Sequence, residues 1–246
     1  MSEVLFQFLR IEAHGAGAAE DLLAEANRVP SHCTHIEHPI PARWLMGSPK
    51  EVTHEVASFM LQPQPFRSKS GEVLYRKTRC DQRCFVDCVA SYPVETERVK
   101  RASDIEKQTL KDWLHKTHHF IQSQFGAHHI ASCLHFDESH PHLHFYIVEN
   151  ASRLHPGLRA EFCGRQRIKD GKERARRHRA GLKAFLDLYY SEVSSTFDHS
   201  RGDHRRSARR IPKRKDYKKW KELFEWSKEP IETELPSDSV GLHRPT

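Results

Sequence analysis

The chain has 246 residues, enough for one large domain or for one domain with an appendage. Apolar residues make up 37% and charged residues 30%, so a core can form while part of the chain stays solvated or binds a partner. The sequence contains no apolar run of about 18 residues and no signal peptide. We therefore expect a cytoplasmic protein with reduced thiols and no membrane span.

Positive charge is concentrated in the second half of the chain, although the formal net charge is only +7. Of the 40 Lys and Arg residues, 21 lie between Arg153 and Lys219, whereas the first 150 residues are nearly balanced. This asymmetry predicts a polyanionic partner, most simply nucleic acid, with a solvated basic helix as the alternative. The candidate contacts to DNA phosphates are Arg165, Arg167, Arg174, Arg176, Arg177, Arg205 and Arg206.

The sequence pattern of the N-terminal third of the chain predicts a strand followed by two helices. The strand is expected at 4–10, where apolar residues run together as in a strand buried on both faces. Helices are expected at 18–28, before Pro30, and from Ser48 to about 61, and an irregular segment lies between them. The pattern of residues 62–80 does not assign them to an element.

The rest of the chain alternates strands with long helices. A capping box formed by Ser103 and Glu106 opens a helix that Gly126 ends. The other expected elements are strands at 84–90, 129–136 and 142–149, a loop at 150–171, a helix at 172–197, and a basic stretch at 205–220 that leads to a short helix. This order predicts an α+β fold with a central antiparallel sheet flanked by helices and a basic helical C-terminal extension.

The segment His135-Phe-Asp-Glu-Ser-His-Pro-His-Leu-His144 carries the strongest chemical signal. His142 and His144 are two residues apart, so on a strand they share one face, and His135 ends the preceding strand. Three neutral imidazoles at one point form a divalent-metal site, which Asp137 or Glu138 could complete. The alternative is a polar face exposed to solvent, because an HxH pair alone is common on strands.

The stretch HFDESHPHLHFYIVEN resembles the metal motif of HUH-type relaxases, and within them the Pre/Mob (MOBV) family. Weaker similarities accompany it, and together they cover about residues 1–202. They are Phe8-Leu-Arg10, Val89-Ala-Ser-Tyr-Pro93, and the stretch 181–190 followed by Ser200-Arg-Gly202. The resemblance implies a palm-like HUH endonuclease domain at 1–202. The composition of the remaining residues predicts a basic helical extension at 203–229 and a disordered tail at 230–246.

The resemblance also implies a function. Such an enzyme nicks one strand of a plasmid transfer origin, keeps the 5′-phosphate on the protein and can rejoin the strand. Its partners would be single-stranded or supercoiled plasmid DNA and other transfer proteins. His135, His142 and His144 would be the metal ligands, with Glu138 as an outer or additional ligand. Mn²⁺ suits this donor set best, and Mg²⁺ or another divalent ion is the alternative.

The nucleophile is where the sequence departs from the family. Many members have His-Asn-x-Arg near the N-terminus, but the comparable stretch here is Glu25-Ala-Asn-Arg28. The histidine cluster just after it makes His35, then His32, the preferred nucleophile, with Arg43 as the nearby charge. The cluster could instead be an ordinary polar loop or a second metal site.

Three other functions stay open at this point. One is a DNA-binding protein of the same fold that does not cleave. The second is a replication initiator with a tyrosine nucleophile, whose usual Tyr-x-x-Lys pattern neither Tyr189 nor Tyr190 fits. The third is a structural zinc protein, which would need closed tetrahedral ligation and no basic DNA channel.

Overall fold

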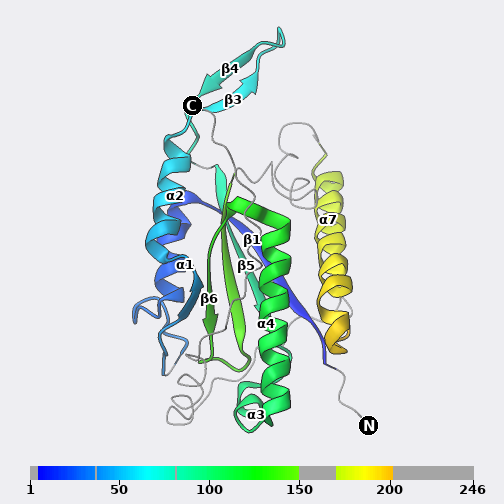
Figure 1. Cartoon of the computed structure of the whole chain (residues 1–246). Coiled ribbons are helices and arrows are strands. Elements are labelled where there is room, and N and C mark those ends of the chain that lie inside the picture. The colour runs from blue at the N-terminus through cyan, green and yellow to red at the C-terminus, as the bar shows by residue number, and fades with distance from the viewer. Residues whose placement is uncertain (1–4, 37, 81, 150–169, 202–246) are drawn as a thin grey trace, which may run out of the picture.

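The computed structural model describes residues 5–36, 38–80, 82–149 and 170–201. Its helices and strands appear in Figure 1. In chain order they are β1 (Phe8–Gly15), the 3-10 turn η1 (Ala16–Ala18), α1 (Ala19–Ala26), β2 (Arg43–Met46), α2 (Pro49–Leu61), β3 (Gln64–Arg67), β4 (Val73–Arg76), β5 (Arg83–Ser91), α3 (Thr96–Lys100), α4 (Asp104–Phe125), the turn η2 (Gly126–His128), β6 (His129–His135), β7 (His142–Val148), α7 (Gly171–Glu192) and the turn η4 (Ser194–Phe197).

Five strands form one antiparallel sheet in the order β1-β5-β7-β6-β2. This confirms the expected α+β architecture. The first strand was expected at 4–10, but β1 runs from Phe8 to Gly15, where it pairs with β5. β2 was not expected, because its four residues are all half-buried and show no alternation.

Helices cover both faces of the sheet, with α1 and α2 on one side and α4 and α7 on the other (Figure 1). The two faces follow from the alternation of side chains along each strand. Leu143 and Phe145 of β7 belong to the core shared with α4 and α7, whereas Tyr146 belongs to the core shared with α1 and α2. β7 is therefore buried on both sides, with His144 alone among its residues half-buried.

Local capping signals set the bounds of the long helices. The Ser103 side chain accepts a hydrogen bond from the Glu106 backbone, and the Glu106 carboxylate accepts one from the Ser103 backbone. The chain leaves α4 at Gly126, whose φ of +55° glycine tolerates best. α7 ends at Glu192 rather than at 197, because Val193 departs from helical geometry and η4 follows.

Residues 62–80 form a two-stranded hairpin, β3–β4, that stands apart from the main sheet beyond the end of α2 (Figure 1). Its turn closes where the backbone N–H of Ser68 donates to the carbonyl of Glu72, and Gly71 adopts a positive φ of +88°. The sequence pattern did not reveal this ribbon because Pro65 interrupts β3 and every residue of β4 is exposed.

The expected extension at 203–229 and tail at 230–246 lie outside the described residues, as does most of the loop at 150–171. Among the helices of the described ranges, none has the length and apolarity that crossing a bilayer requires.

Candidate metal centre

The pairing of β6 with β7 brings three histidines to one point on the face that α1 and α2 cover. His135 lies opposite His142, and Cys133 lies opposite His144. The ring centroids of the three histidines are 5.0–5.3 Å apart. One nitrogen from each ring lies within 4.8 Å of the others. The predicted convergence of these side chains is therefore confirmed.

Each of the three rings is held from its outer side by an oxygen that can only accept a hydrogen bond. The ring atoms and acceptors are His135 Nε2 with the Ala26 carbonyl (2.9 Å), His142 Nδ1 with the His140 carbonyl (3.0 Å), and His144 Nδ1 with the Asp87 carboxylate (3.1 Å). These outer nitrogens must carry the protons, so the inner nitrogens of the neutral rings present lone pairs. Histidines that bind metals are oriented in this way.

Two of the inner nitrogens face each other at 3.2 Å, Nδ1 of His135 and Nε2 of His142. Burial lowers the pKa of His135 well below its ordinary value and also lowers that of His142, so both rings stay neutral. Two lone pairs at this distance repel, whereas two ligands about 2.1 Å from a shared ion would be about 3 Å apart. The arrangement fits a divalent cation.

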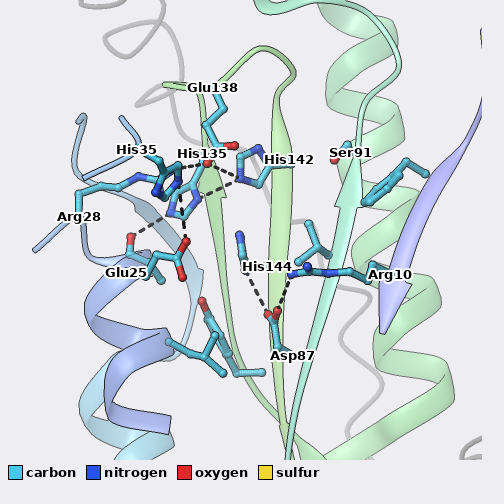
Figure 2. A pocket seen from close by; sticks show the side chains of 15 residues that line it. Arg10, Glu25, Arg28, His35, Asp87, Ser91, His135, Glu138, His142 and His144 are labelled. Atoms are coloured by element: carbon cyan, nitrogen blue, oxygen red, sulfur yellow. Dashed lines mark hydrogen bonds and ion pairs between the residues drawn. The ribbon is translucent and has the colours of Figure 1, made fainter. Parts of the chain in front are cut away.

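Asp87 of β5 supplies the carboxylate behind His144. Its side chain is 2% exposed and also lies 3.5 Å from the guanidinium of Arg10 (Figure 2). Burial alone would raise the pKa of Asp87, but His144 and Arg10 outweigh burial and lower it. Asp87 therefore stays ionised and fixes the tautomer of His144.

A buried ion pair closes the other side of the site. Arg28 donates to both carboxylate oxygens of Asp137, at 2.6 and 2.7 Å, and the backbone N–H of Ile40 donates to the same carboxylate. Arg28 has a positive φ of +58°, a strained conformation for a residue with a side chain. Asp137 is thus occupied by structural contacts and is a poor candidate ligand.

Glu138 is the carboxylate available to the histidines. Its Oε1 atom lies 3.6 Å from Nε2 of His142 and 3.0 Å from Arg28, and its side chain is 38% exposed. Burial raises the pKa of Glu138, but His142 and Arg28 outweigh burial and lower it. An ionised carboxylate beside the open edge of the ring cluster agrees with the predicted outer or additional ligand.

The histidines line a pocket of about 240 Å³ that extends from α1 across β7 and β5 to β1 (Figure 2). At one side His35 and Glu25 enter it, with His35 Nε2 3.8 Å from the Glu25 carboxylate. At the other side it is lined by Phe8, Arg10 and Ser91. The pocket gives the inner nitrogens an opening to solvent and to a ligand.

Of the four residues proposed as catalytic, two lie at the candidate metal centre and two do not. His35 and Glu138 line the pocket, whereas His32 and Arg43 do not. His32 instead lies 3.3 Å from Asp21 on α1, and Arg43 pairs in β2 opposite Leu134. The structure therefore does not bring His32 or Arg43 to the candidate metal centre.

Tyr189 lies in the core on the opposite side of the sheet, within the cluster shared by α4 and α7. It is 1% exposed, and its hydroxyl is 3.2 Å from that of Thr117. This burial agrees with the sequence-based preference against Tyr189 as a nucleophile.

The proposed DNA-binding arginines are only partly described. Arg176 and Arg177 are exposed on α7, and both pair with Glu173, at 2.7 and 2.8 Å. Neither lines the pocket. The side chain of Arg174 is not described, and the remaining candidates lie outside the described residues, namely Arg165, Arg167, Arg205 and Arg206.

Sequence reasoning missed the residues that support the site, Arg28 and Asp87 above all. A signal existed for Asp87, which is the single charged residue inside the apolar run Cys84–Ala90. Its position two residues from Phe85 and Val89 predicts the same face as those side chains. The pairing of Arg28 with Asp137 spans 109 residues, and no local pattern indicates it.

Comparison with known proteins assigns the family. The model of the Mob_Pre family, described as a plasmid recombination enzyme, matches residues 76–219. No curated protein matches the chain.

Solved structures resemble the chain at low identity. Two structures of the MobM relaxase domain (MOBV; Mob_Pre), both Mn-bound and in complex with plasmid pMV158 oriT DNA, match it at 17% and 16% identity, each with a TM-score of 0.49. The first covers 88% of this chain and 99% of its own, and the second covers 89% and 98%. The family model spans more than half of the chain and includes the three histidines, and the chain therefore belongs to the Mob_Pre family of plasmid recombination enzymes.

Proposed function

We propose that the chain is a relaxase, a metal-dependent endonuclease that nicks one DNA strand at a plasmid transfer origin and later rejoins it. One observation carries the proposal. Three imidazoles, each held by a hydrogen-bond acceptor from behind, turn their inner nitrogens toward one point in an open pocket that also contains His35. Membership of the plasmid recombination enzyme family supports the same reaction. The protein would act in the cytoplasm, where plasmid DNA lies.

His135, His142 and His144 would hold the ion, and Glu138 is placed to join them or to orient a bound water. Imidazole donors with one carboxylate favour Mn²⁺ over Mg²⁺, which prefers oxygen ligands. Mn is also the ion in the MobM structures. A divalent ion held here would supply Lewis-acid stabilisation of the negative charge on the scissile phosphate.

His35 is the proposed nucleophile. One ring nitrogen attacks phosphorus and forms a P–N bond, while the bond from phosphorus to the 3′ oxygen breaks. The leaving oxygen takes a proton from solvent and departs as a 3′-hydroxyl. The attacking ring loses its remaining N–H proton to Glu25, whose carboxylate lies 3.8 Å from Nε2 of His35. Attack by the 3′-hydroxyl on the same phosphorus reverses each step and rejoins the strand.

The pocket offers a path for the single strand on either side of the phosphate. Arg10 is half-exposed at the pocket wall, where it can contact a phosphate. Phe8 is 39% exposed on the same face of β1, where a base can stack on its ring. Basic side chains outside the pocket, including Arg176 and Arg177, would add affinity that depends on salt.

The test is formation of a covalent adduct. A single-stranded oligonucleotide carrying the cognate transfer origin is incubated with the full chain and Mn²⁺ or EDTA, and the adduct is resolved by denaturing electrophoresis and mapped by mass spectrometry. We expect an adduct with Mn²⁺ only, on the peptide that contains His35. The H35A variant should lose it, and H32A, a matched histidine outside the pocket, should keep it.

Other outcomes assign other functions or residues. Detection of the adduct on Glu25 would overturn His35 as the nucleophile. Loss of the adduct in the H32A variant would do the same. Tight binding of the oligonucleotide with no adduct at any metal concentration would identify a DNA-binding protein of this fold that does not cleave. Cleavage that EDTA leaves unchanged would contradict the metal centre.

A further inference from the structure

We propose that His118 and His129 form a second cation site, which lies on the opposite face of the sheet from the candidate metal centre and takes Zn²⁺. His118 belongs to α4, and His129 is the first residue of β6. Neither histidine lines the pocket that contains His135, His142 and His144. The inference does not depend on the proposed function, because neither residue is assigned a part in the DNA reaction.

The two histidines bury three ring nitrogens that make no hydrogen bond within the described part of the chain. These atoms are Nε2 of His118 and both nitrogens of His129. His129 is only 5% exposed. Buried polar atoms in folded proteins are nearly all satisfied, so this pair calls for a ligand from solvent, either an ion or water.

The spacing of the two rings fits ligands of one ion. Their centroids are 5.2 Å apart, within the 5.0–5.3 Å that separates the rings of the candidate metal centre. Both rings lie against Phe145 of β7, at 6.1 Å for His118 and 5.5 Å for His129. The phenyl ring supplies no hydrogen-bond acceptor, so the lone pairs of the imidazoles remain available to an ion.

Both rings are in the protonation state that a metal ligand needs. Burial lowers the pKa of His118 and lowers that of His129 to about 4. The backbone of Ala131 opposes the shift at His129 without meeting the geometry of a hydrogen bond. Each ring is therefore neutral at pH 7 and has one lone pair, so an ion can bind without displacing a proton.

The third ligand would come from His115, one turn earlier on α4. Within the described residues, the two groups of three side chains already gathered for a metal both belong to the candidate metal centre. His115 is exposed and three residues from His118, so the two side chains lie on the same side of the helix. Rotation of His115 toward the ion, together with a water, would complete a tetrahedral shell.

The donor set selects the kind of ion. Imidazole nitrogens without a carboxylate suit Zn²⁺, which binds three histidines and a water readily. Mn²⁺ and Mg²⁺ favour sites that include oxygen ligands. The second site should therefore take Zn²⁺ and not Mn²⁺, whereas the candidate metal centre, with Glu138 beside its histidines, should bind both ions.

An ion held here would link α4 to β6. The two elements follow each other in the chain through the short turn η2, and His118 and His129 lie on either side of it (Figure 1). Because the unfolded chain does not hold the two rings together, Zn²⁺ would bind the folded form and stabilise it.

The experiment counts bound ions by titration calorimetry on the full chain, without a purification tag and after treatment with chelator. We expect the parent chain to bind two Zn²⁺ but one Mn²⁺. The H142A variant, which lacks a ligand of the candidate metal centre, should still bind one Zn²⁺. The H118Q/H142A variant should bind none with comparable affinity.

Two matched variants test the third ligand. H115Q/H142A should bind the remaining Zn²⁺ more weakly than H142A, and H119Q/H142A, which changes an adjacent exposed histidine of the same helix, should bind it as H142A does. A larger loss in H119Q/H142A than in H115Q/H142A would overturn the assignment of His115.

Thermal unfolding gives a second measure that does not depend on counting. At Zn²⁺ about 100 times its dissociation constant, the folded form of H142A gains about 100-fold over the unfolded form. The melting temperature of H142A should then rise by about 5 °C or more, and that of H118Q/H142A should not. X-ray absorption at the zinc edge of H142A should show imidazole scattering, a result that requires no substitution of His118.

Contrary results are clear-cut. One Zn²⁺ in the parent and none in H142A would mean that the pair holds water alone, and would overturn the proposal. Equal Zn²⁺ affinity in H142A and H118Q/H142A would remove His118 from the site. H118Q should form the covalent DNA adduct with Mn²⁺ as the parent does, so failure of the relaxase reaction and failure of the zinc site are distinguishable.

Discussion

The Nδ1 atom of His135 lies 3.2 Å from the Nε2 atom of His142, and neither nitrogen carries a proton when its ring is neutral. This relationship distinguishes a metal site from a polar strand face, where neighbouring rings would form hydrogen bonds or turn toward solvent. Either a cation lies between these two nitrogens, or the repulsion between their lone pairs destabilises the fold.

Replacing a ligand should abolish metal binding. Loss of a hydrogen-bond acceptor behind a metal-binding histidine weakens metal affinity by roughly 10–100-fold. We expect H142A to weaken Mn²⁺ binding by more than this, because the variant lacks one of the three nitrogen donors. Titration calorimetry and the Mn²⁺ electron spin resonance signal measure it. H128A changes a half-exposed histidine away from the pocket and is the control. Unaltered Mn²⁺ affinity in H142A would contradict the assigned site.

Replacing the carboxylate behind His144 should weaken the site without removing a ligand. D87N keeps the shape but can no longer bind the His144 ring as an anion, so we expect about 10–100-fold weaker Mn²⁺ binding and an intact fold by circular dichroism. The control is E12Q, which changes a half-exposed carboxylate that contacts the same Arg10. Equal losses in both variants would point to Arg10 rather than to the orientation of His144.

Breaking the buried pair of Arg28 and Asp137 should destabilise the fold. Their side chains are 3% and 0% exposed, so D137A leaves a buried guanidinium whose one remaining side-chain partner among the described residues is Glu138. We expect a loss of about 3–5 kcal/mol in the free energy of unfolding, measured by urea denaturation. E173A removes an exposed pair on α7 and should cost at most about 1 kcal/mol. A small effect of D137A would show that water reaches Arg28.

The free energy of unfolding should decrease as the pH is lowered, in part because of His129. Burial between β6 and α4, together with the neighbouring His118, lowers the pKa of His129 to about 4. Its ordinary value is higher, so the unfolded chain binds the extra proton. This contribution is therefore complete above about pH 6.5 and is lost as the pH falls toward 4, by up to about 3 kcal/mol.

The H129Q variant tests this titration, because glutamine has no proton to gain. In chelator, its stability should change less between pH 6.5 and 4 than that of the parent chain. H128Q, at the adjacent half-exposed position, should follow the parent. Parallel curves for H129Q and the parent would show that another group controls the acid transition.

Tyr189 should matter for stability and not for the reaction. Its hydroxyl contacts Thr117 in the core, so Y189F should cost about 1 kcal/mol in the free energy of unfolding. The yield of covalent adduct should stay unchanged, since the tyrosine lies on the face opposite the histidines. Loss of the adduct in a folded Y189F would favour the tyrosine chemistry of replication initiators.

The convergence of the three candidate ligands could be predicted from the sequence because their geometry is local. The period of two along a strand puts His142 and His144 on one face, and a short turn returns the chain to His135. Capping signals likewise predicted both ends of α4. Four of the five strands of the sheet were predicted from the alternation of strands and helices, although the first lies later than expected and β2 was missed.

The rest of the site depends on contacts that join distant segments, which a sequence pattern does not encode. Asp87 supports His144 from β5 across 57 residues, and Arg28 meets Asp137 across 109. The choice between His32 and His35 depended on which way a loop without regular structure turns. The β3–β4 hairpin was missed because Pro65 interrupts β3 and every residue of β4 is exposed, so the segment shows no apolar period.

All three candidate ligands sit within ten consecutive residues on one β hairpin, and only strand register determines which way they point. A slip of β7 by one residue against β5 and β6 would change that direction. The rings of β7 would then exchange places with Leu143 and Phe145 and face the core shared with α4 and α7. A shift of one position in strand pairing would therefore remove two imidazoles from the pocket and bury them among apolar side chains.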